Sequence, residues 1–147
     1  MKKKPVIVTI VIVAAAAILI GGGIYLYPHL VERTVSQVVD NDMTDVIKIE
    51  MQNGNNGNTI ELTDKESIDE ITALLKDVKV RKCFNQWDSS TGWSLRITMA
   101  TDKDEEIDLS VGQAVNGERY EYDDSMDMSK TIDYIKDKYG LNDVPLY

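Results

Sequence analysis

The stretch VIKIEMQNGNNGNTIELTDKESIDEITALLKDVKV, residues 46–80, changes its hydrophobic period several times and decides the fold. In VIKIEM the residues Ile47, Ile49 and Met51 form one apolar face, and NTIELT repeats the alternation after the polar stretch between them. A period of two is typical of half-buried strands. The stretch therefore predicts two strands that are close in sequence.

The segment QNGNNGN, residues 52–58, joins these two strands and has no charged or apolar side chain. Gly and Asn tolerate the positive φ of a chain reversal, so we expect a hairpin loop whose distinguishing property is mobility. It lacks the alternating carboxylates of a calcium loop and the Lys followed by Ser or Thr of a phosphate loop. The segment is interpreted as a turn.

A helix and a third strand follow. The spacing of Thr63 and Glu66 in TDKE predicts a capping box, and the helix should end near Asp77. The apolar stripe of this helix is Ile68, Ile71, Leu74 and Leu75. In VKVRKCF, residues 78–84, alternation predicts a core face of Val78, Val80 and Phe84 and an outer face of Lys79, Arg81 and Cys83.

The remaining pattern adds strands and one helix. WSLRITMA (93–100) and IDLSV (107–111) alternate, Asn116-Gly117 is a two-residue hairpin signal before ERYEYD, and Gly140 ends a second amphipathic helix. The order β-β-α-β-β-β-β-α predicts an α+β domain with a mainly antiparallel sheet of about five to six strands and two helices on one face.

Residues 6–27 contain no charged side chain over 22 positions, enough to span a bilayer as a helix. The lysines at positions 2–4 favour a cytoplasmic N-terminus, and Tyr25 and Tyr27 lie where interfacial aromatic residues belong. The alternative is a cleaved signal peptide with its site at Ala14-Ala15-Ala16. The apolar run continues past that site and favours an uncleaved signal anchor.

The chain is thus divided into an anchor with its cytoplasmic lysines (1–27), a juxtamembrane helix or stalk (28–43), an extracytoplasmic domain (44–140) and a C-terminal tail (141–147). All 25 acidic residues follow residue 27, whereas three of the 16 basic ones precede it, which leaves a net charge of −12. Nucleic acid is therefore excluded as a partner. We expect a cell-membrane protein with a possible protein or cell-wall partner.

The run from VIKIEM through LTDKESIDEI, WSLRITMATDKDEEIDLSV and GERYEYD to IDYIKDKYG, about residues 44–140, resembles the small membrane-anchored or lipoprotein extracytoplasmic domains common in Gram-positive Firmicutes. Many members of this group are uncharacterised, and the resemblance implies no catalytic residue. It rests on the pattern, above all on the strand-to-helix junction.

No constellation for catalysis, cofactor or metal binding is evident. Cys83 is the only cysteine, and the sole histidine, His29, is expected at a different height beside the membrane. TDKDEEID begins like an EF-hand loop but has Ile107 where glycine is required, and YDDSMDMS (122–129) has no such spacing. We expect no catalytic, cofactor-binding or metal-binding residue, no cofactor and no enzymatic activity.

The loop FNQWDSSTGW, residues 84–93, is the strongest candidate for a contact surface. The average burial of tryptophan favours a Trp87 folded back over the open end of the sheet. The alternative is an exposed indole that binds a protein or a sugar. The candidate binding residues are Asn85, Gln86, Trp87, Asp88 and Arg81.

The leading functional hypothesis is a membrane-anchored, non-enzymatic binding module for a protein or a cell-envelope component. A structural or assembly subunit is the first alternative, because Ala17 and Gly21 have the small-xxx-small spacing of associating membrane helices. An envelope enzyme without a recognisable motif is the second.

Overall fold

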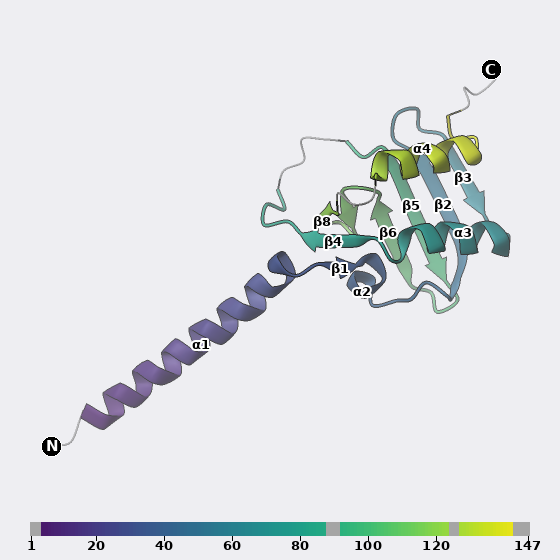
Figure 1. The fold of residues 1–147 in the computed structure, drawn as a ribbon. Coiled ribbons are helices and arrows are strands. Elements are labelled where there is room, and N and C mark those ends of the chain that lie inside the picture. Colours follow the sequence, from purple (N-terminus) through teal and green to yellow (C-terminus); the bar gives the residue numbers. More distant parts are fainter. Residues whose placement is uncertain (1–3, 88–91, 124–126, 143–147) are drawn as a thin grey trace.

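The apolar N-terminal run forms helix α1, Lys4–Leu30, which projects away from the rest of the chain (Figure 1). The computed structural model describes residues 4–87, 92–123 and 127–142. Within α1 the stretch Ile7–Leu30, 24 residues, is long and apolar enough to cross a membrane. At about 1.5 Å per residue it is roughly one turn longer than a bilayer core of about 30 Å.

Within the described residues, eight strands form one antiparallel sheet in the order β1-β4-β8-β7-β6-β5-β2-β3 (Figure 1). Their bounds are β1 Arg33–Thr34, β2 Val46–Asn53, β3 Thr59–Leu62, β4 Lys79–Lys82, β5 Leu95–Thr101, β6 Glu106–Ser110, β7 Ala114–Val115 and β8 Glu118–Tyr122. The predicted α+β class and antiparallel sheet are confirmed. The count exceeds five to six, partly because β1 and β7 have only two residues each and give little sequence signal.

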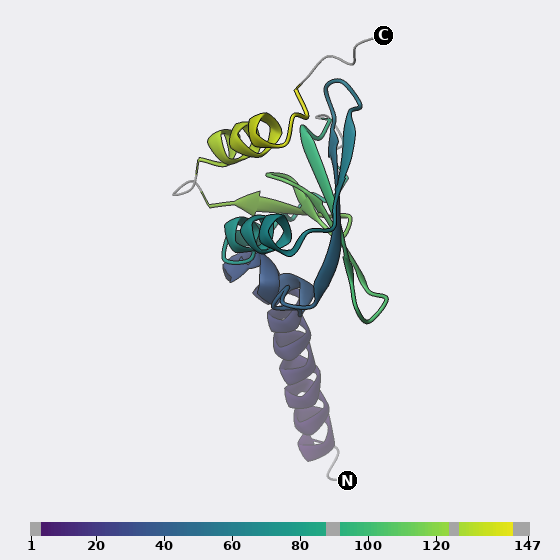
Figure 2. The ribbon, with the colours of Figure 1, turned by 90° about the vertical axis from the view of Figure 1, so that its right-hand side faces the viewer.

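Helices α2 (Val35–Val39), α3 (Lys65–Leu75) and α4 (Met128–Lys138) cover one face of the sheet (Figure 2). The core between the layers contains Ile49, Ile71, Leu95, Ile97 and Ile135, each with no exposed surface. The opposite face bears charged pairs such as Arg96 with Asp108, which is typical of a sheet that is solvated on one side.

The N-cap of α3 is Asp64, not the predicted Thr63. The Asp64 carboxylate accepts the Ser67 N–H at 2.9 Å and its backbone is extended, as an N-cap requires. A capping box does occur at α2, where the Thr34 side chain accepts the Gln37 N–H and the Gln37 side chain accepts the Thr34 N–H.

Two residues assigned to the core by alternation are exposed. Ile47 is exposed because the pairing of β2 with β5 shifts register between Val46 and Lys48, and a bulge moves the extra side chain to the other face. Phe84 is exposed because β4 ends at Lys82, so the alternation does not reach it.

The segment 28–43, expected as a helix or stalk, is packed into the domain. It comprises the end of α1, then β1 and α2, and Val35 is buried in the core. The domain therefore begins within a few residues of the end of the apolar stretch in α1. In the predicted tail Leu141 is also buried, while residues 143–147 lie outside the described residues.

The Asn/Gly loop is bound to the chain's C-terminal segment. The side-chain amides of Asn53, Asn56 and Asn58 each donate to the Leu141 carbonyl, at 3.0, 2.9 and 3.2 Å. Asn53 is only 1% exposed. Gly54 is required by close approach, because a Cβ there would lie 2.0 Å from the Trp93 carbonyl oxygen. The loop is a hairpin as predicted, but its side chains have a structural role beyond that of a turn.

Candidate functional site at the anchor-proximal edge

Strands β1, β4 and β8, together with residues 83–87, form the end of the sheet nearest α1, here called the anchor-proximal edge. β1 directly follows α1 and pairs with β4, with Arg33 opposite Val80. The segment that leaves β4 then lies beside the last turn of α1 (Figure 1). Helix α1 and the sheet edge are thus in direct contact.

A ring stack joins the two elements. The His29 imidazole stacks on Phe84 with 4.3 Å between centroids and 14° between planes, and the Tyr25 ring is tilted against the imidazole with 5.4 Å between centroids. His29 Nδ1 is 3.0 Å from the Lys82 carbonyl oxygen. Because a carbonyl only accepts, Nδ1 carries the proton and donates. His29 is 7% exposed, so the end of α1 is held on β4 by stacking and a hydrogen bond.

This position overturns the expectation that His29 lies at a different height from Cys83, since His29 contacts the residues on both sides of that cysteine. The thiol nevertheless has no hydrogen bond to the imidazole among the described contacts. Burial, followed by the charge of Glu121, raises the pKa of the Cys83 thiol. A raised pKa disfavours the thiolate, the nucleophilic form.

Gln86 fixes the loop that follows. Its amide nitrogen donates to the carbonyls of Cys83, at 2.6 Å, and Arg119, at 3.1 Å, and its amide oxygen accepts the Arg119 N–H at 2.8 Å. The Asn85 carbonyl accepts from the Arg119 guanidinium at 3.3 Å. Gln86 therefore links the loop to β8, and the backbone that leads to Trp87 is held in a defined conformation.

Trp87 is 93% exposed. Its N–H donates to Asn85 Oδ1 at 3.1 Å, which closes a local turn. The favoured expectation, a tryptophan folded back over the end of the sheet, is therefore wrong, and the indole is exposed as the alternative requires. Asp88, another candidate of this loop, lies outside the described residues. Asn85 is exposed beside Trp87, and Phe84 is 58% exposed in spite of its stack on His29.

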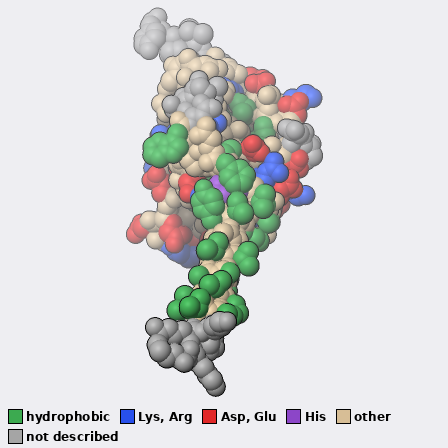
Figure 3. Space-filling view, turned by 90° about the vertical axis from the view of Figure 1, so that its left-hand side faces the viewer, with side chains coloured by type: hydrophobic (Ala, Val, Ile, Leu, Met, Phe, Trp, Pro, Cys, Tyr) green, Lys and Arg blue, Asp and Glu red, His purple; other side chains and the backbone are tan. Residues whose placement is uncertain are grey.

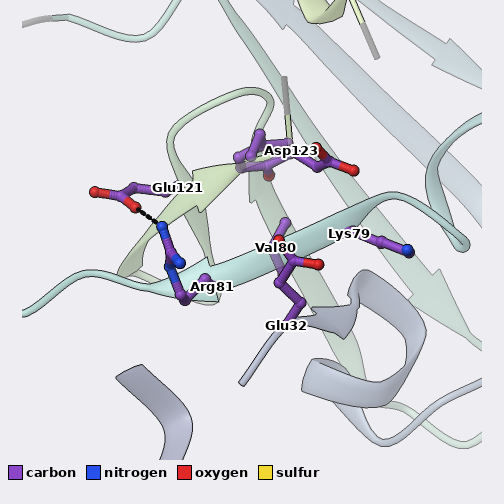
Figure 4. Close-up of a pocket in the computed structure, with 7 residues that line it drawn as sticks. Glu32, Lys79, Val80, Arg81, Glu121 and Asp123 are labelled. Atoms are coloured by element: carbon purple, nitrogen blue, oxygen red, sulfur yellow. Dashed lines mark hydrogen bonds and ion pairs between the residues drawn. The ribbon is translucent and has the colours of Figure 1, made fainter. Parts of the chain in front are cut away.

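Arg81 faces a polar groove of ≈ 340 Å³ between β4, β8 and the start of β1 (Figure 4). Its guanidinium donates to Glu121 at 2.8 Å, and Lys79, Glu32 and Asp123 also line the groove. The charges of the acidic and basic side chains that line this groove largely cancel. Arg81 thus borders the groove instead of the aromatic side chains of the loop.

The anchor-proximal edge concentrates positive charge. Its strands contain five of the 13 basic residues that follow residue 27, but only two of the 25 acidic ones. The five are Arg33, Lys79, Arg81, Lys82 and Arg119. With Glu32 and Asp123, which line the groove beside these strands, the edge has five basic and four acidic residues, whereas the rest of the chain after residue 27 has eight basic and 21 acidic ones. The edge is therefore far less acidic than the rest of the domain.

Lys136 of α4 is a polar residue that the sequence did not single out. It is 3% exposed, its ammonium donates to Ser94 Oγ at 2.8 Å, and burial lowers its pKa. An amine beside a hydroxyl is the pairing of a base and a nucleophile. Catalysis by this pair would need a substrate bound at the Ser94 hydroxyl. Neither Lys136 nor Ser94 lines the groove described above. We interpret the pair as a structural contact.

The sequence candidates Trp87 and Arg81 both lie at this edge, whereas His29, Phe84 and Arg119, which also form it, were not among the candidates. The usable signal was the position of His29 directly after the apolar run, where an interfacial ring can contact the domain. Figure 3 shows hydrophobic side chains along α1 that continue onto the base of the domain. No protein-family model, curated protein or solved structure matches this chain.

Proposed function

We propose that this chain is a single-pass membrane protein whose acidic domain lies outside the cytoplasm and acts as a non-enzymatic binding module for a protein or a cell-envelope component. The observation that carries the proposal is the exposure of Trp87, 93%, on a loop held by Gln86 and Arg119. An exposed indole in a pre-formed loop supplies apolar contact area at little entropic cost, which is typical of an interaction hot spot.

The membrane arrangement has its own support. The lysines before α1 favour a cytoplasmic N-terminus, and one helix is long and apolar enough to span. An uncleaved anchor is favoured because the end of α1 is integrated with β4 through His29. Cleavage after Ala16 would leave an apolar remnant attached to that contact. Protease added to intact cells should remove the domain and spare α1; a mature N-terminus at Ala17 would contradict the anchor.

The binding role is tested in the native membrane with a photo-crosslinking amino acid in place of Asn85, whose side chain is exposed beside Trp87. We expect a discrete crosslinked product that is lost with Trp87→Ala. The matched control carries the crosslinker in place of Asn55, which is exposed in the remote Asn/Gly loop. Equal products from both positions, or a product indifferent to Trp87→Ala, would contradict a contact surface at this loop.

A further inference from the structure

We propose that the partner of the Trp87 loop is the lipid headgroup layer of the bilayer that α1 spans. This inference rests on the proposed function and names the envelope component. Docking of the loop would fix the domain on its own membrane and direct the acidic end of the sheet away from the surface.

The first argument is position. The stretch Ile7–Leu30 exceeds the bilayer core by roughly one turn, so its last turn, with His29, belongs to the interfacial layer. Phe84 stacks on that histidine at 4.3 Å. Trp87 follows Phe84 by three residues and projects from the same short loop. The stack therefore brings the start of the loop to the level of the headgroups.

The second argument is the chemistry of the exposed side chains. Outside α1, four large hydrophobic residues are exposed among the described residues, and two of them, Phe84 and Trp87, are in this loop. Tryptophan favours the membrane interface, where its ring contacts apolar matter and its N–H stays in a polar layer. The surface is also continuous with α1, because Tyr25 and Phe84 contact the same His29 ring.

The third argument is charge. A domain with a net charge of −12 after residue 27 is repelled by lipid phosphates unless its approaching face differs. The anchor-proximal edge, counted with Glu32 and Asp123 of its groove, has five basic and four acidic residues, whereas acidic residues strongly dominate elsewhere. This edge is thus the face with which the domain can approach phosphate groups, and it is the face beside α1.

The test is the fluorescence of the full chain reconstituted in phosphatidylcholine–phosphatidylglycerol vesicles that contain lipids brominated near the headgroup. The chain has two tryptophans, so Trp93→Phe leaves Trp87 as the reporter. We expect bromine to reduce its emission about twofold, because quenching requires contact with the interfacial layer. The matched control carries Trp87→Phe, Trp93→Phe and Asn55→Trp, which places the reporter in the Asn/Gly loop, remote from α1 (Figure 1); its emission should not change.

The same result is available without altering Trp93, as the difference in quenching between the wild-type chain and Trp87→Phe. Unquenched Trp87 emission together with Trp87-dependent crosslinking to a protein would overturn the lipid partner and leave the binding module standing. Unquenched emission without any Trp87-dependent crosslink would overturn both proposals. Equal quenching of the Trp87 and Asn55→Trp reporters would overturn the inference, because lipid would not then distinguish the two ends of the domain.

Discussion

At the end of the sheet away from α1, β2 and β5 bury Ile49, Met51, Leu95 and Met99 completely, whereas the loop after β4 leaves Phe84 and Trp87 in contact with solvent. The distal end is closed by α3, α4 and the Asn/Gly loop (Figure 2). The anchor-proximal edge has a polar groove, excess basic residues and the contact with α1. We infer that stability is concentrated at the distal end and binding at the anchor-proximal edge.

The largest loss of stability is expected from Leu95→Ala at the distal end. Leu95 is the first residue of β5, pairs with Asn53 and has no exposed surface, so truncation leaves a cavity and should cost about 3 kcal/mol of the free energy of unfolding. Denaturant unfolding of the full chain in detergent micelles measures the loss. If Leu95→Ala costs no more than Trp87→Ala, the assignment of stability to the distal end fails.

The next largest effect is expected from Asn53→Ala. Asn53 is 1% exposed and donates to the Leu141 carbonyl and to Asn142 Oδ1, while its own Oδ1 accepts the Asn55 N–H. Loss of these buried bonds should lower the free energy of unfolding by about 2 kcal/mol and speed amide exchange at Leu141. Asn55→Ala is the control, because Asn55 donates to Asn53 Oδ1 through its backbone N–H, which the substitution keeps. Equal effects of the two would show that the amide contacts are unimportant.

Leu95 and Asn53 also show what could and could not be predicted from the sequence. The strand containing Leu95 was evident because alternation is a local property. The contacts of Asn53 with Leu141 join residues 88 positions apart, and an asparagine in a Gly-rich segment has the same local signature whether it is buried or free. Phe84 was assigned to the core because alternation does not state where a strand ends. His29 lies 53 positions before Lys82 and meets it only in the folded chain.

Lys136→Met tests the energetic cost of the buried amine in α4. Burial lowers the folded-state pKa of Lys136 from 10.5, so between that lowered value and 10.5 the unfolded chain binds more protons and stability rises with pH. Removing the amine should abolish this rise and raise the free energy of unfolding at neutral pH by about 1 kcal/mol. Urea unfolding from neutral to alkaline pH is the measurement.

Lys138→Met is the matched control for Lys136→Met, and its effect on the free energy of unfolding at neutral pH should have the opposite sign. The Glu70 carboxylate raises the pKa of Lys138, so the contribution of this contact is fully present below 10.5 and is lost as pH rises through the higher folded-state value. Removal should therefore destabilise the chain at neutral pH and leave the alkaline rise due to Lys136. If stability still rises with alkaline pH in Lys136→Met, the assignment of that rise to Lys136 is wrong.

The smallest effect on folding is expected from Trp87→Ala, because a side chain that is 93% exposed has little packing to lose. The free energy of unfolding should change by less than about 0.5 kcal/mol.

Phe84→Ala should lower the free energy of unfolding more than Trp87→Ala, since it removes the stack on His29 that holds α1 against β4. Melting of the two variants in micelles and in vesicles separates the two roles: Phe84→Ala should lower the midpoint in both. Trp87→Ala should do so only in vesicles, where the wild-type loop gains a lipid contact. An early melt of Trp87→Ala in micelles would mean that the indole packs on the domain, and the division between a stabilising end and a binding edge would then fail at its most exposed residue.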